Sequence, residues 1–239
     1  MTLASLGLAA ILASPTANAD ESPTSRSRAV AGHEVSLELG TLAAPDPDWE
    51  YLGSGNQISS YGVRAGWGFT PALALVASWH RGADGVEFDG PSSDDTGGDD
   101  EDLLFRTSFI SHQFALGPKL QWRVTPWLAP YATLQGLGVL GTARLDDGFD
   151  DDDNPNQYTY RGLAPGGFVS GGVDVKPVRL AKGMRLGTHI ELGYALTGRM
   201  RLVQEGGRDP ASTDEPGTAQ LGAVGFRGFT MRFGVGVHF

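Results

Sequence analysis

The last twelve residues of the chain, Gly228–Phe239, read Gly-Phe-Thr-Met-Arg-Phe-Gly-Val-Gly-Val-His-Phe. Every second residue from Phe229 to Phe239 is apolar, and the residues between them are Thr230, Arg232, Gly234, Gly236 and His238. Because successive side chains of a β-strand point to opposite faces, this alternation predicts a strand with two different surroundings. An apolar face, a polar or bare face and a terminal aromatic are typical of a strand between lipid and a crowded polar interior. A strand of a soluble β-sandwich is the alternative that this stretch leaves open.

Seven further segments have strand-like patterns. They span residues 33–43, 58–69, 72–82, 104–124, 127–145, 167–178 and 184–201. In six of them apolar residues alternate with polar residues or glycine, as Leu186, Ile190 and Leu192 alternate with His189 and Glu191 in the last one. The segment 127–145 has no clear alternation and contains Pro130, which is usually found at sheet edges.

The connections between these segments alternate between short and long. The short ones are Thr70-Pro71, Thr125-Pro126 and 179–183, and the long ones are 44–57, 83–103, 146–166 and 202–227. The long connections hold 22 of the 28 acidic residues. Three tryptophans, Trp67, Trp122 and Trp127, lie beside short turns, as residues of a membrane-interface girdle do. We therefore predict an all-β fold, a closed eight-stranded antiparallel up-and-down transmembrane β-barrel over residues 33–239, because lipid requires every backbone group to be paired.

The residues before the barrel fit an export signal. Residues 3–13 are apolar and Ala17-Asn18-Ala19 is a small-x-small cleavage site, so we expect a signal peptide over 1–19 and a flexible lead-in over 20–32. No Lys or Arg stands in the first twelve residues, which suggests that the true translation start lies upstream. The chain has no Cys, which excludes disulfides and thiolate metal sites, and its net charge of -10 argues against a nucleic-acid partner.

The C-terminal alternation, the terminal Phe239 and the Thr-Pro turns at 70–71 and 125–126 give the chain a family resemblance. It resembles the eight-stranded outer-membrane barrels of the OmpA-type transmembrane domain, OmpX and OmpW group. The resemblance implies a bacterial outer-membrane location, with membrane lipid and lipopolysaccharide as surroundings. It also implies that Phe239 is the signal that the barrel-assembly machinery recognises.

The predicted interior is rich in charge. Strand parity sends inward the residues Glu38, Arg64, Lys119, Arg123, Asp174, Lys176, Arg185, His189, Glu191 and Arg232, together with His80 and His238. An eight-stranded barrel is just wide enough to be filled by side chains, and charges away from water must pair. We therefore expect a salt-bridged plug formed by Glu38, Asp174 and Glu191 with the neighbouring cations. A narrow, cation-lined pore is the alternative.

Candidates for catalysis or metal binding are weak. His189 and Glu191 share a face, but no nucleophile can be assigned to them. Ser111-His112 is similar to the lipid-A deacylase pair, although adjacent strand residues point to opposite faces. The acidic run Asp150, Asp151, Asp152 and Asp153 could bind Ca²⁺ or bridge through divalent cations to lipopolysaccharide, but Pro155 stands where an EF-hand needs glycine.

These observations predict a non-enzymatic outer-membrane barrel without a cofactor. Its role would be structural, envelope-stabilising or a surface interaction through acidic extracellular loops. Two alternatives remain: a small pore for ions or apolar molecules, as in the OmpW group, and a lipid-modifying enzyme.

Overall fold

The computed structural model describes residues 32–44, 49, 52–89, 103–147, 156–204 and 222–239. The strands are β1 Glu34–Ala43, β2 Gln57–Gly68, β3 Leu73–Asp89, β4 Leu103–Gln121, β5 Leu128–Asp147, β6 Asn156–Ala181, β7 Met184–Arg201, the two-residue β8 Val203–Gln204, and β9 Ala223–His238. None of the described residues belongs to a helix long and apolar enough to cross a membrane.

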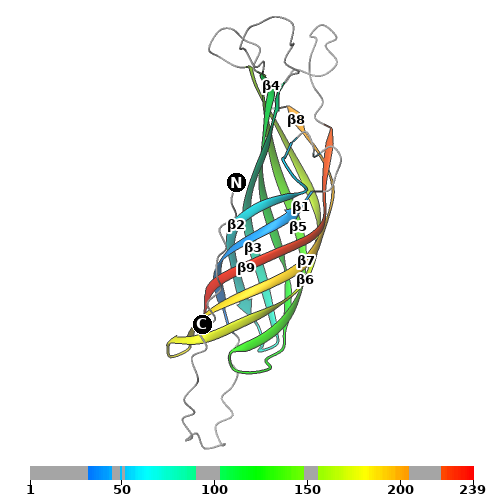
Figure 1. The fold of residues 1–239 in the computed structure, drawn as a ribbon. Helices are drawn as coiled ribbons and strands as arrows, with labels where there is room; N and C mark the ends of the chain where they lie inside the picture. Colours follow the sequence, from blue (N-terminus) through cyan, green and yellow to red (C-terminus); the bar gives the residue numbers. More distant parts are fainter. Residues whose placement is uncertain (1–31, 45–48, 50–51, 90–102, 148–155, 205–221) are drawn as a thin grey trace, which may run out of the picture.

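The eight long strands form a closed antiparallel ring (Figure 1). Neighbours in sequence pair with each other from β1 to β7, β7 pairs with β9, and β9 returns to β1. Beyond the last ladder pair, His33 N donates to Phe239 O at 2.6 Å and Phe239 N donates to His33 O at 2.9 Å. The predicted eight-stranded up-and-down barrel is confirmed, and the C-terminal strand closes it against the first.

Two of the short turns share one construction. The Thr70 hydroxyl accepts backbone N–H groups of Ala72 and Leu73 at 3.2 and 3.0 Å. The Thr125 hydroxyl accepts those of Trp127 and Leu128 at 3.4 and 3.0 Å. A hydroxyl that mimics a backbone acceptor, followed by proline, is a strong local turn signal. These turns, the β6–β7 turn and the C-terminus lie at the lower end of the barrel in Figure 1.

Several strands extend further than their sequence pattern predicts. β3 continues to Asp89 rather than residue 82, β6 begins at Asn156 rather than 167, and β8 was not expected. The ladder between β3 and β4 includes the pair Glu87 and Arg106, whose exposed side chains also form an ion pair. A sheet that projects beyond lipid is wet outside, so its exterior need not be apolar and the alternation fades. The long connections are correspondingly shorter than predicted.

β5 tolerates Pro130 because the proline stands at the third position of the strand and faces outward. Its carbonyl still accepts the N–H of Trp122 at 2.9 Å. Odd-numbered residues from Ala129 to Ala143 face inward, which resolves the parity that the sequence left unclear.

The barrel exterior is an apolar belt. Leu37, Leu192 and Phe229 expose 70, 61 and 77% of their surface between the strand ends. Near the short turns, Trp122 and Trp127 expose 56 and 48%. An apolar surface that surrounds the whole barrel far exceeds the patches that soluble proteins expose, and it matches the lipid-facing band and aromatic girdle of a transmembrane barrel.

Candidate functional site: the barrel interior

One row of the strand ladder positions two histidines on a single carboxylate. Glu38 on β1 is in register with Gly62 on β2 and Gly234 on β9, and these glycines are in register with His80 and His189. Because the glycines have no side chains, the imidazole rings of His80 and His189 can lie over them and approach the Glu38 carboxylate. His80 Nε2 lies 2.8 Å from Glu38 Oε2, and His189 Nε2 lies 2.6 Å from Glu38 Oε1.

Arg64 connects this row to two further carboxylates. Its Nη1 lies 2.8 Å from Glu191 Oε2 and 3.4 Å from Glu38 Oε1, and its Nε lies 3.2 Å from Glu34 Oε1. The Tyr131 hydroxyl donates to Glu191 Oε2 at 3.0 Å. The Arg64 side chain is 1% exposed. A guanidinium suits this position because its planar fork carries five donors.

Lys119 holds the second half of the network. Its ammonium lies 2.8 Å from Glu34 Oε2 and 2.9 Å from Asp174 Oδ2, and it stands 4.3 Å from the centre of the Tyr131 ring. Lys176 approaches the same Asp174 oxygen at 3.3 Å. Sharing each carboxylate between cations satisfies charges that burial would otherwise destabilise.

Arg232 completes the network at the Glu191 end. Its Nη1 is 3.6 Å from Glu191 Oε1, and its guanidinium lies 4.2 Å from the centre of the Phe168 ring. We call the eight charged residues of this assembly the charge network: Glu34, Glu38, Asp174, Glu191, Arg64, Lys119, Lys176 and Arg232. Its four carboxylates equal its four cations, so the network is electrically neutral when the histidines are neutral.

The upper half of the interior is apolar, whereas the sequence analysis predicted only a crowded, charge-rich interior. Trp49, between β1 and β2, is 1% exposed and packs edge-on against Phe109 at a ring distance of 5.0 Å. Phe226 and Leu52 belong to the same buried cluster. The Trp49 indole N–H donates to Gly55 O at 2.5 Å. We call this cluster the apolar cap. Trp49 and Leu52 lie in a predicted connection and Phe226 lies on a strand extension, whereas Phe109 lies within the predicted strand 104–124.

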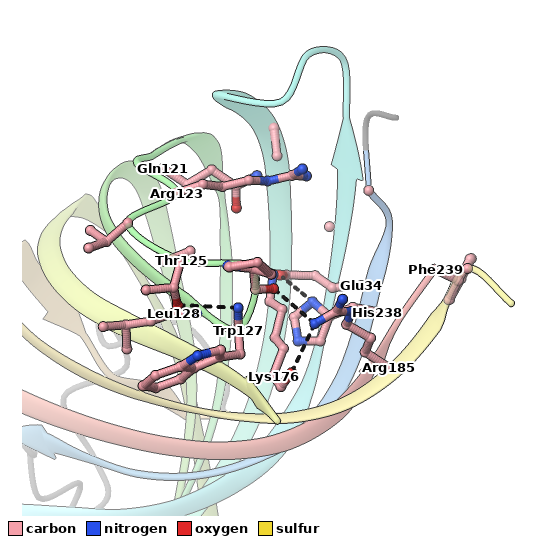
Figure 2. Close-up of a pocket in the computed structure, with 17 residues that line it drawn as sticks. Glu34, Gln121, Arg123, Thr125, Trp127, Leu128, Lys176, Arg185, His238 and Phe239 are labelled. Atoms are coloured by element: carbon pink, nitrogen blue, oxygen red, sulfur yellow. Dashed lines mark hydrogen bonds and ion pairs between the residues drawn. The ribbon is translucent and has the colours of Figure 1, made fainter. Parts of the chain in front are cut away.

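The lower end of the barrel, by contrast, is hollow. A cavity of about 690 Å³ opens there between the β4–β5 turn and the ends of β1, β6, β7 and β9 (Figure 2). Arg123, Lys176, Arg185 and His238 line it together with Glu34. We call this cavity the vestibule.

The predicted lumen residues divide between these regions. Eight of the ten, Glu38, Arg64, Lys119, Asp174, Lys176, His189, Glu191 and Arg232, lie in or beside the charge network. Arg123 lies beyond the end of β4 and is exposed, and Arg185 bonds backbone carbonyls, so both line the vestibule instead.

Sequence reasoning left out one residue of the charge network, Glu34, and one hydrogen-bond partner of the network, Tyr131. Glu34 shares the parity of Glu38 but stands at the strand start, and Tyr131 lies on the strand whose parity was unclear.

Ser111 and His112 lie on opposite faces of β4, as their adjacent positions predicted. Ser111 is buried inside the barrel, while His112 stacks on Trp79 outside at a ring distance of 6.0 Å. Asp150, Asp151, Asp152 and Asp153 lie outside the described residues.

No protein-family model and no curated protein matches the sequence. Solved structures with a similar fold include Ail, the attachment invasion locus protein of Yersinia pestis, which is 12% identical over 87% of this chain and 97% of that one, with a TM-score of 0.43. Neisserial surface protein A is 15% identical over 87% and 94%, with a TM-score of 0.40. A major outer membrane protein from Thermus thermophilus is 13% identical over 87% and 98%, with a TM-score of 0.43. The chain's own strand pairing and lipid-facing exterior make it an eight-stranded barrel of the outer-membrane type.

Proposed function

We propose that the protein is a closed, non-enzymatic barrel of the bacterial outer membrane, with a structural, envelope-stabilising or surface-interaction role. The observation that carries this proposal is the double closure of the interior. Arg64, tied to three carboxylates, fills the polar half, and Trp49 with its aromatic neighbours fills the apolar half. A pathway for ions or apolar molecules would have to disrupt both.

Conductance across a planar bilayer tests this proposal. We expect the purified, refolded protein to insert without unitary current steps over a wide range of voltages, while a trimeric porin under the same conditions gives clear steps. Insertion is checked separately by the heat-modifiable gel mobility of the reconstituted protein. Reproducible steps from inserted protein would favour the pore alternative and overturn the closed barrel.

The exterior supports lipid and lipopolysaccharide as partners. On the outward face, Arg81 Nη1 donates to the Tyr61 hydroxyl at 3.0 Å, and the neighbouring Trp79 and His112 stack. A cation beside interfacial aromatic rings suits the headgroup level of a membrane, where phosphate groups lie. Bridging of lipopolysaccharide by divalent cations at the acidic loops, and recognition of Phe239 by the barrel-assembly machinery, belong to the same proposal.

A lipid-modifying activity has less support. Ser111 is buried inside the barrel and His112 faces outward, so the two cannot act together on one lipid. Mass analysis of lipid A from cells with and without the protein tests the point. We expect identical lipid A, and a new acylation pattern that depends on the protein would overturn the non-enzymatic proposal.

A further inference from the structure

The vestibule differs from the charge network above it in its balance of charge. Beyond residue 33, the only side-chain carboxylates outside the four long connections predicted from the sequence are Glu34, Glu38, Asp174 and Glu191. All four already contact cations of the network. Arg123 and Arg185 therefore add two positive charges to the vestibule, against one negative charge from the terminal carboxylate of Phe239, which also lines it. Neither arginine has a carboxylate within 4.0 Å among the residues that the structure describes.

Two hydrogen bonds to backbone carbonyls fix the guanidinium of Arg185 at the edge of the cavity. Its Nη1 donates to Pro126 O at 2.9 Å and to Lys176 O at 3.4 Å, which fixes the guanidinium beside the β4–β5 turn (Figure 2). A guanidinium has five N–H donors, and these two bonds use only one of its nitrogens. Figure 2 places Arg123 across the same opening, so two arginines from different strand ends border one space.

We propose that the vestibule binds an anion that carries a phosphate group. Two guanidinium groups around a water-accessible cavity match the charge of a phosphate dianion, and their planar forks can bond its oxygens in pairs. The network behind them is neutral and cannot supply the compensating charge. A cavity of about 690 Å³ is large enough for pyrophosphate or a lipid headgroup.

The phosphate could come from either of two sources. One is a soluble phosphate compound in the periplasm, which the short-turn end faces under the proposed function. The other is the headgroup of a phospholipid in the adjoining leaflet, since Trp127 and Phe239 line the cavity where it meets the apolar belt. The shared chemistry is the phosphate group, and the experiment distinguishes the sources.

Binding is measured by calorimetry on the full-length mature protein in nanodiscs of phosphatidylcholine, with inorganic pyrophosphate as the probe. Native mass spectrometry measures retention of phosphatidylglycerol from mixed-lipid nanodiscs. The variant is Arg123→Gln with Arg185→Gln, and the matched control is Lys182→Gln, an exposed cation of the same barrel end that does not line the cavity. Heat-modifiable mobility confirms that each variant is folded.

We expect saturable binding of one probe, weakened about tenfold or more by the double substitution and less than about twofold by Lys182→Gln, because hydrogen bonds to charged groups are worth about 1.5–3 kcal/mol. Pyrophosphate binding would identify a soluble ligand, and phosphatidylglycerol retention alone a headgroup. If neither probe binds saturably, or if the double variant and the control bind like the wild type, the site is disproved. Failure of the phosphate site would not contradict the proposed closed barrel. Equally, a barrel that conducts ions would not contradict the phosphate site.

Discussion

At the scale of single residues, two glycines make the Glu38 row possible. A Cβ atom added at Gly234 would overlap the imidazole of His189, and one added at Gly62 would overlap the backbone of Trp79 and the imidazole of His80. The two histidines can therefore approach Glu38 closely only because glycine stands at both positions. Small residues in a narrow barrel act here as packing elements rather than as flexible points.

Gly234→Ala tests this packing. We expect the substitution to lower the free energy of unfolding by about 1–3 kcal/mol, because His189 must leave its position beside Glu38. Reversible urea unfolding in lipid vesicles, followed by tryptophan fluorescence, measures the change. Gly138→Ala is the control, since a Cβ at Gly138 has no atom within 4 Å. Equal stability of the two variants would contradict the close packing.

Glu38→Gln tests the charge balance of the network. The neutral amide leaves one cation in excess inside the barrel, so we expect a loss of about 3–5 kcal/mol in unfolding free energy. Glu87→Gln removes a carboxylate of an ion pair that is more than half exposed, and we expect about 0–1 kcal/mol. The same unfolding assay compares them, and a Glu38→Gln variant as stable as Glu87→Gln would show that the network charge is dispensable.

At the scale of strands, the sequence predicts best where one face contacts lipid. The bounds Met184–Arg201 of β7 match the prediction to the residue, and β1 and β2 differ by a single residue at their starts. β6 was predicted to begin eleven residues late because its upper part, which includes Gly162 and Pro165, lacks apolar alternation. Hydrogen bonding to β5 maintains that part, and periodicity carries no information about pairing of this kind.

Parity also limits what can be predicted of the interior. It indicates which side chains point inward but not which rows they share, since the row depends on the stagger between strands. Arg123 shares the parity of Lys119, yet β4 ends at Gln121 and Arg123 leaves the network. Trp49 lies in a connection with no periodicity, so nothing in the sequence placed it inside the barrel.

Trp49 and the girdle tryptophans differ in their surroundings, which fluorescence can measure. We expect a variant that retains only Trp49 to resist quenching by brominated lipids, while variants that retain only Trp122 or only Trp127 are strongly quenched. The reason is that Trp49 is enclosed by the apolar cap and the other two are about half exposed at the outer surface. Phenylalanine replaces the removed tryptophans. Lipid quenching of Trp49 equal to that of Trp122 would place it outside the barrel.

At the scale of the whole molecule, charge is sorted along the barrel axis. The long connections predicted from the sequence hold 22 of the 28 acidic residues, including those that the structure places on the extended ends of β3 and β5. The charge network in the middle is balanced, and the short-turn end carries Arg123, Arg185 and Lys182. Each end can then interact with its own surroundings, acidic loops on one side and a cationic vestibule on the other.

The C-terminal residue separates assembly in the cell from stability of the barrel. Phe239 is 51% exposed, and its backbone bonds to His33 are only two of the many that close the ring. We therefore expect deletion of Phe239 to leave refolding into lipid vesicles nearly intact while sharply reducing the folded protein recovered from outer membranes of expressing cells. Heat-modifiable gel mobility measures the folded fraction in both settings.

The matched control is Phe69→Ala, which removes another outward aromatic at the same barrel end, 65% exposed, without altering the terminus. If Phe239 acts as a recognition signal, the control assembles normally in cells and the deletion does not. Equal defects in the two variants would mean that the girdle needs aromatic surface at any position. Normal assembly of the deletion variant in cells would show that Phe239 is not a recognition signal. Pairing of β9 with β1 would then be sufficient for assembly.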